Sequence, residues 1–406
     1  MRRALDHPAF RRLFAAQIVA LLGTGLATVA LGLLAYDLAG PDAGQVLGTA
    51  LAIKMVAYVV VAPIAQAAVA RLPRRGVLIG ADLVRLVVAA GLPFVGDVWQ
   101  IYALIFVMQA ASATFTPTFQ SVIPDILTDE DDFTAALSLS RLAYDLEAVA
   151  SPLLAALALL VVPSATLFFG TAVGFAASAL LVAATVLPGR IAATGPDDVE
   201  RPFGARARHG IVLFLREPGL RPVLALNLTV AAAGAFVLVQ TVMIARSHFG
   251  LGEDAVAVLL AVSGAGSMTA ALLLPRVLRR VPERRVMLPG AVLVTGATAL
   301  VPLALGAGGP FAIGALWLVI GLGWSAVETP VGRLIRRHVP APDLGAAFAA
   351  QFSLSHACWL VTYPLAGWLG AVGLGRAALV LAVVAGLATG LAVRWWPAPV
   401  AAEMTS

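Results

Sequence analysis

Residues 140–152 read SRLAYDLEAVASP and place three ionisable side chains, Arg141, Asp145 and Glu147, inside the apolar segment 133–160. A segment of this length is typical of a membrane-spanning helix, which needs about 20 apolar residues. Ionisable groups at bilayer depth cost about 2.5–3.5 kcal/mol each on insertion scales, so they usually face the protein interior and serve a function. We therefore predict that this span carries the chemistry and that most other spans are scaffold.

The composition of the whole chain is that of a polytopic membrane protein. Of its 406 residues, 60% are hydrophobic and 12% are charged, whereas a soluble domain carries about 25% charged residues. The net charge of +5 comes with no basic run apart from the apolar segments, which argues against a nucleic-acid partner. The single cysteine, Cys358, excludes an intrachain disulfide.

Apolar stretches of spanning length predict an all-α protein with twelve transmembrane helices. They lie at about 13–38, 44–70, 76–96, 100–122, 133–160, 164–188, 219–245, 254–275, 286–306, 310–334, 344–369 and 375–396. Gly, Pro and charged residues separate them, as in AGPDAG, RLPRRG and GAGGP.

The loop arginines predict the orientation. An even number of spans puts both termini on one side, and nearly all loop arginines fall on that side, with only Arg246 and Arg376 on the other. The positive-inside rule then predicts that both termini are cytoplasmic. Basic residues are almost all Arg, with one Lys in the chain, which favours a bacterial source and hence the bacterial inner membrane.

The two halves of the chain repeat each other. Four pairs of segments match in the same order at offsets between 209 and 213, for example HPAFRRLFAAQ from His7 with EPGLRPVLALN from Glu217. We predict a six-helix bundle over 1–190, a cytoplasmic linker with a short amphipathic helix over 191–216, and a second bundle over 217–406. Such a duplication is the layout of transporters whose two halves rock about a midplane site.

This layout resembles the major facilitator superfamily over nearly the whole chain. The residues that carry the resemblance are RLPRRGVLIGADLVR, between the second and third spans, and AVASPLLA in the fifth. Against the family loop pattern Gly-x-x-x-Asp-Arg-x-x-Gly-Arg-Arg, the chain has Gln66, Ala70 and Pro73 in place of the first Gly, the Asp and the second Gly, and it keeps Arg71, Arg74 and Arg75, with Asp82 and Arg85 beyond. The resemblance implies a gating loop, and the missing acid weakens its role as a latch.

Two further motifs resemble a branch of that family. AVASPLLA is similar to the Gly-Pro motif of proton-driven exporters, with Ser151 in place of Gly, and TPTFQSVIPDIL in the fourth span resembles macrolide and siderophore exporters. The resemblance implies proton-driven export.

The charges of the fifth span lie on two helix faces. At 100° per residue, Arg141 and Asp145 share one face, while Tyr144, Glu147 and Ser151 share another. One hypothesis is a structural Arg141–Asp145 pair with a solvated Glu147. The other is that an acid exchanges a proton during transport, because an apolar cavity disfavours a charged carboxyl. Glu147 is the first candidate, since its own helix offers it no partner, and Asp145 is the second.

Lys54, in the second span, is the candidate counter-charge. Helical rise puts it about 25 Å above Arg71, and it puts Asp145 and Glu147 about 18 and 21 Å above Phe133. A lysine–carboxylate pair across the cavity therefore fits. The alternative is that Lys54 extends to the outer interface.

The face of the eleventh span that corresponds to the Glu147 face of the fifth span is aromatic. At an offset of 212, Tyr144, Glu147 and Ser151 correspond to His356, Trp359 and Tyr363. Such a face suits a flat organic ligand or a stacked cation, or it is ordinary helix packing. His356 is either a second titrating group or a hydrogen-bonded spacer. His356 and Cys358 point to different faces, so we predict no metal site.

Other polar residues of the spans are candidates for cavity lining or proton transfer. Glu328, before Thr329–Pro330, either lines the cavity or pairs with Arg333. Polar rows that we expect to line the cavity contain Gln17, Thr24, Thr28, Gln109, Ser112, Thr116, Asn227 and Gln240.

The sequence therefore predicts a proton-coupled exporter of a small drug-like or siderophore-like molecule that works by alternating access. Its partners are that substrate, protons and the lipid bilayer; we expect a monomer with no cofactor and no enzymatic activity, because no nucleotide-binding loop or nucleophile–base pair is evident. A metal-ion exporter or solute importer of the same fold, and a non-transporting receptor or scaffold, remain open as alternatives.

Overall fold

The computed structural model describes residues 5–61, 72–127, 129–187, 211–340 and 343–397; some side chains of α6, α7 and α16 are outside the description. The helices of the first half are α2 (Pro8–Ala39), α3 (Ala43–Val56) continued by the π-helical η2 (Ala57–Val61), α5 (Arg74–Gly91), α6 (Val98–Ile126), α7 (Glu130–Leu159) and α8 (Thr166–Ala183). Those of the second half are α11 (Arg221–Val242) continued by η4 (Met243–His248), α12 (Glu253–Val277), α13 (Arg284–Leu303) continued by η5 (Ala304–Gly308), α14 (Gly309–Glu328), α15 (Val331–His338), α16 (Leu344–Val372) and α17 (Leu374–Trp395).

These helices form twelve membrane spans. Eight continuous stretches of the described residues are long and apolar enough to cross a membrane, and two of them, Pro8–Val61 and Arg284–His338, have 54 and 55 residues and hold two spans each. With α7 and α16, which are 30 and 29 residues long, the count reaches twelve. The predicted fold class is confirmed.

The proline at the end of the tenth span breaks it. α14 ends at Glu328, and α15 begins at Val331, directly after Pro330. Proline removes a backbone donor and clashes with the preceding turn of a helix, so the predicted span 310–334 is two helices rather than one. The predicted linker lies mostly outside the described residues, although residues 211–216 are helical.

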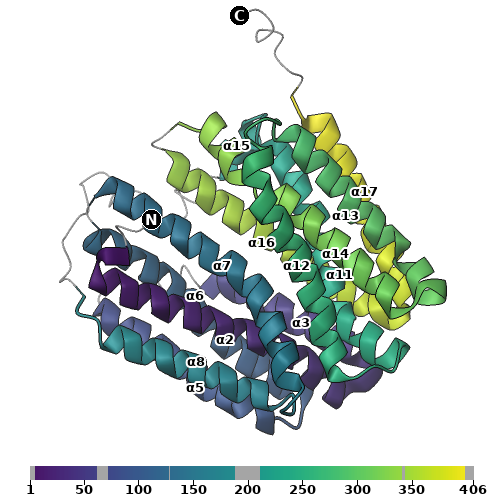
Figure 1. Cartoon of the computed structure of the whole chain (residues 1–406), viewed down its shortest axis with the longest axis horizontal. Coiled ribbons are helices and arrows are strands. Elements are labelled where there is room, and N and C mark those ends of the chain that lie inside the picture. Colours follow the sequence, from purple (N-terminus) through teal and green to yellow (C-terminus); the bar gives the residue numbers. More distant parts are fainter. Residues whose placement is uncertain (1–4, 62–71, 128, 188–210, 341–342, 398–406) are drawn as a thin grey trace, which may run out of the picture.

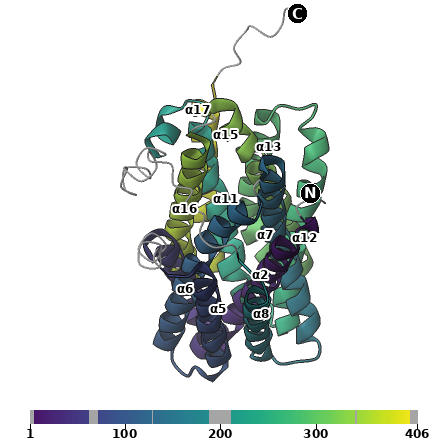
Figure 2. The same cartoon turned by 90° about the vertical axis from the view of Figure 1, so that its left-hand side faces the viewer.

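The two halves form separate bundles that lie side by side (Figure 1), with helices running in a common direction (Figure 2). We call the side on which α2 begins and α17 ends the terminal side, and the opposite side the distal side. Across the boundary between the bundles, α3 packs on α16 and α7 packs on α12.

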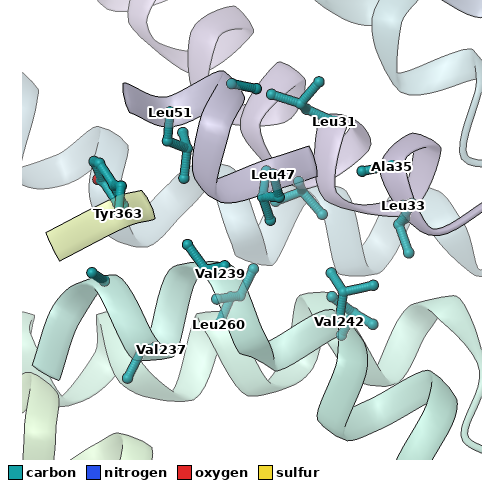
Figure 3. Packing of buried hydrophobic residues seen from close by; sticks show 14 of the residues in the cluster. Leu31, Leu33, Ala35, Leu47, Leu51, Val237, Val239, Val242, Leu260 and Tyr363 are labelled. Atoms are coloured by element: carbon teal, nitrogen blue, oxygen red, sulfur yellow. The ribbon is translucent and has the colours of Figure 1, made fainter. Parts of the chain in front are cut away.

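The buried apolar side chains show where the halves are joined. One core cluster draws on both halves at the distal side, where Leu47 of α3 lies across from Val239 and Val242 of α11 (Figure 3). On the terminal side, among the described residues, each half has a core of its own: one contains Phe10 and the other contains Phe214. The halves are therefore closed against each other distally and are not joined by a shared core at the terminal side.

Glycines allow the distal contact. A Cβ on Gly48 of α3 would lie 2.6 Å from the backbone oxygen of Tyr363 and 3.1 Å from the Cα of Gly367 on α16. A second contact between the halves joins η4 to α2, where Ser247 donates a hydrogen bond of 3.3 Å to the hydroxyl of Tyr36. Close backbone approach between helices requires such small residues.

We expect Gly48→Ala to open the distal side. The added methyl group meets backbone atoms that cannot rotate away, and overpacking of this kind costs about 1–3 kcal/mol. Spin labels on Asp42→Cys and Arg376→Cys, in a Cys358→Ser background, would report the change as a population at longer distance. Gly80→Ala is the matched control, because nothing lies within 4 Å of a Cβ at Gly80. Identical distance distributions in both variants would show that this contact does not set the conformation.

Candidate functional site

Glu147 lies on the face of α7 that packs on α2. A Cβ at Gly25 of α2 would overlap the side chain of Ser151 and lie 2.7 Å from Glu147 Oε1. Gly25 therefore leaves the room that Glu147 and Ser151 occupy. Glu147 is half-buried and Ser151 is buried, so the carboxyl group lies within the protein.

Lys54 is the charged partner of this carboxyl group. It lies in the last turn of α3 and interacts electrostatically with Glu147 of α7, although these two described side chains make no direct salt bridge. Lys54 also lines a small pocket with Gln109 of α6, so it points into the first bundle and does not extend to the outer interface.

Tyr58 and His356 join the charged pair to the second half. The ring centroid of Tyr58, one turn beyond Lys54, lies 5.9 Å from that of His356 on α16. Glu147 interacts electrostatically with Tyr58, and Lys54 does so with His356. We call Lys54, Tyr58, Glu147 and His356 the central cluster. It brings together residues from three spans and from both halves.

Aromatic rings extend the central cluster along α16. The ring centroids of Phe352 and His356 are 3.9 Å apart. The ring centroid of Trp359 lies 5.0 Å from that of Tyr363 and 5.1 Å from that of Trp324 on α14. Exposure falls along this face from 50% at Phe352 to 7% at Tyr363. The aromatic face is thus accessible toward the terminal side and closed toward the distal side.

Several predicted lining residues instead hold helices of one half together. Tyr144 makes side-chain hydrogen bonds to Thr116 and Gln17, and Ser140 donates a hydrogen bond of 3.0 Å to Gln17. In the second half, Asn227 exchanges hydrogen bonds of 3.2 and 3.0 Å with Gln351. The two halves therefore place a buried polar pair between their first and fifth spans, which corrects the expectation that Asn227 lines a cavity.

Gln240 is also a packing residue. It is fully buried between Gly44 of α3 and Gly370 of α16, and its Nε2 donates a hydrogen bond of 2.7 Å to the backbone oxygen of Ala366. It belongs to the distal contact between the halves. Gln109 does line the pocket beside Lys54.

The predicted gating residues lie in a helix. Because α5 begins at Arg74, Arg74, Arg75 and Asp82 are helical, and Arg71 is outside the described residues. Arg74 pairs with Asp125 of α6, and Arg75 donates to the backbone oxygen of Ala183. These contacts tie spans of the first half to one another, and none of them crosses to the second half.

Asp82 lies in the helix α5, where it is buried and paired, and this corrects its assignment to the gating loop. Its carboxylate pairs with Arg85 and accepts a hydrogen bond of 2.8 Å from Ser178 of α8. The Arg85 guanidinium lies 4.4 and 4.5 Å from the ring centroids of Phe115 and Phe175. In the second half, Glu283, directly before α13, accepts hydrogen bonds of 3.0 and 3.2 Å from Arg337.

Three further predicted residues, Arg141, Asp145 and Glu328, are not part of the central cluster as defined above. The side chains of Arg141 and Asp145 lie outside the described residues, so their pair stays a prediction. Glu328 ends α14 and interacts electrostatically with Cys358 of α16.

The sequence predictions missed Tyr58 and Trp324. Tyr58 follows Lys54 by four residues and so shares its helix face, a spacing that was available in the sequence. Trp324 gave no such signal, because its contact with Trp359 depends on how α14 packs on α16.

Known proteins share this architecture. Residues 13–361 match the family model of the Major Facilitator Superfamily. An uncharacterized MFS-type transporter of Bacillus subtilis (strain 168), YfiS, is 24% identical over 361 residues, which are 85% of this chain and 84% of that protein.

Solved transporter structures share the fold. A bacterial homolog of the human lysosomal transporter Spinster superposes with a TM-score of 0.73 at 13% identity, over 96% of this chain and 97% of that one. The D-xylose–proton symporter does so with a TM-score of 0.71 at 13% identity, over 96% and 98%, and the nucleoside transporter NupG with a TM-score of 0.70 at 12% identity, over 96% and 99%. Identities this low establish the fold alone.

Proposed function

The chain belongs to the Major Facilitator Superfamily, and within that family we propose that it is a proton-coupled secondary transporter that exports a small organic molecule. The observation that carries this proposal is Glu147, an acid inside the protein whose charged neighbour is Lys54 of another span. An intramembrane acid is costly unless it is used. Its neighbour Tyr58 contacts His356 of the other half, so movement of the halves in alternating access would change its surroundings.

The proposed cycle uses the conformation described above. The distribution of loop arginines supports a cytoplasmic location for the terminal side in a bacterial inner membrane, which makes this structure the inward-facing state. Cargo enters between the halves from the cytoplasm and meets the aromatic face of α16. The halves then part at the distal glycine contact, cargo leaves, and a proton enters to neutralise Glu147 for the return.

Export and proton use are inferred jointly from the residues of the fifth span and their resemblance to exporters. Ser151–Pro152 in α7 stands where proton-driven exporters carry Gly-Pro, and Ser151 lies one turn beyond Glu147 on the α2-facing side of the helix. The name of one structural neighbour, the D-xylose–proton symporter, describes proton coupling with uptake. Import on the same fold is therefore the rival direction.

Transport by the purified protein in liposomes tests the proposal. We expect a pH gradient to drive flux of at least one compound from a panel of drugs, siderophores and divalent metals, with protons moving opposite to the cargo. Flux with protons moving in the same direction as the cargo would establish the importer. The absence of flux under every gradient would favour a receptor or scaffold and overturn the proposal.

A further inference from the structure

A pocket beside the central cluster has a defined set of polar groups. It lies between α2, α3 and α6, and its polar lining consists of Thr24, Thr28, Lys54 and Gln109, with apolar side chains around them. Thr24 and Thr28 donate hydrogen bonds of 3.0 and 3.1 Å to backbone oxygens of their own helix. The groups left for a ligand are therefore the Lys54 ammonium as donor and the Gln109 amide.

Within the part of the chain that the structure describes, the Gln109 amide oxygen lacks a hydrogen-bond partner. The side chain is 4% exposed, and Oε1 is buried with no described donor bonded to it. A buried acceptor without a partner costs about 1–3 kcal/mol, so this oxygen favours a small N–H or O–H donor, and the pocket, at about 10 Å³, has room for about one water molecule. Lys54, on the same pocket wall, favours a ligand that brings an anionic acceptor.

The charges of Lys54 and Glu147 limit the class of ligand that fits this site. Lys54 and Glu147, both described, carry opposite charges within electrostatic range of each other, without a direct salt bridge. An organic cation would pair with Glu147 but be repelled by Lys54. An organic anion would pair with Lys54 but be repelled by Glu147. A molecule with both charges satisfies both side chains.

The aromatic side chains around the central cluster favour a ligand that carries a flat ring. Tyr58 stands one helical turn from Lys54 and contacts His356, and Trp359 packs between Trp324 and Tyr363 further along. Such surfaces bind flat rings by offset or edge-on packing.

We propose that the central cluster binds an aromatic zwitterion, with the carboxylate on Lys54, the ammonium on Glu147 and the ring on the aromatic face. This inference rests on the proposed function and names its substrate class. It also explains coupling, because the ammonium and a proton then compete for Glu147.

Three matched probes test the charge pattern: L-tryptophan, its methyl ester and its N-acetyl derivative. Calorimetry on the full-length protein in detergent at neutral pH, without a gradient, would compare their affinities. We expect wild type to bind tryptophan about tenfold more tightly than either derivative, since each lacks one charge-assisted contact. Lys54→Met is expected to remove only the preference over the ester, and Glu147→Gln only the preference over the N-acetyl compound.

Asp254→Asn, an exposed acid at the distal start of α12, is the control and is expected to keep both preferences. Equal or tighter binding of either derivative by wild type overturns the inference, as does failure of all three probes to bind. If that happens while another compound shows gradient-driven flux, only the substrate class is wrong. If no compound shows flux, the proposed function itself fails.

Discussion

Glu147→Gln is expected to abolish gradient-driven flux, to the level of protein-free liposomes, while exchange of labelled for unlabelled cargo continues. The amide fits the space beside Gly25 that the carboxyl group occupies, but it cannot take up or release a proton. The loaded protein can still change conformation, whereas the step that returns it with a proton is lost. Liposome flux with and without a pH gradient, beside counterflow exchange, separates these two steps.

Asp254→Asn makes the same chemical change at an exposed position and is expected to leave both activities intact. Gradient-driven flux in Glu147→Gln equal to that of wild type would exclude Glu147 as the proton carrier. Asp145 and Glu328 would then be the next carboxyl groups to substitute.

Asp82→Asn is expected to destabilise the protein by about 3–5 kcal/mol, because it leaves the Arg85 charge buried without its partner. Asp82 is fully buried and Arg85 is 4% exposed. The rings of Phe115 and Phe175 and the hydroxyl of Ser178 complete this site, and none of them carries a negative charge. Denaturant unfolding in detergent, followed by the loss of monomeric folded protein, would measure the effect.

The double variant Asp82→Asn with Arg85→Met provides the control. Removing both charges relieves the unpaired guanidinium, so the double variant is expected to be more stable than Asp82→Asn alone. A double variant that loses the sum of both single effects would show that the two side chains do not act as a pair.

Local sequence features predicted the spans well because membrane length and helix breakers determine them. The predicted fourth span, 100–122, is α6 (Val98–Ile126), and the predicted eighth, 254–275, is α12 (Glu253–Val277). Apolar length sets such limits within a few residues, and Gly and Pro end the helices. The same rules put Asp82 in the span 76–96 but did not show that it is buried and paired with Arg85 and Ser178, because a charged residue near the end of a span gives no sign of which neighbouring helix covers it.

The sites of polar side chains were harder to predict because partners come from distant helices. Gln109 and Gln240 look alike in sequence, as single amides in apolar spans. One lines the pocket beside Lys54, and the other closes the distal contact through Gly44 and Gly370. Whether such a glutamine lines the pocket or packs between the halves depends on how α3 packs on α6 and α16. Helical periodicity carries no information about that packing.

Proton release on cargo binding tests the central claim, that Glu147 exchanges a proton for the transported molecule, most directly. Cargo identified by liposome flux would be added to purified protein in weakly buffered detergent solution containing a pH indicator dye, at a pH where the empty protein holds the proton. The account predicts that wild type releases protons on binding and that Glu147→Gln binds cargo without releasing any. Binding without proton release in wild type, or equal release from both proteins, would contradict it.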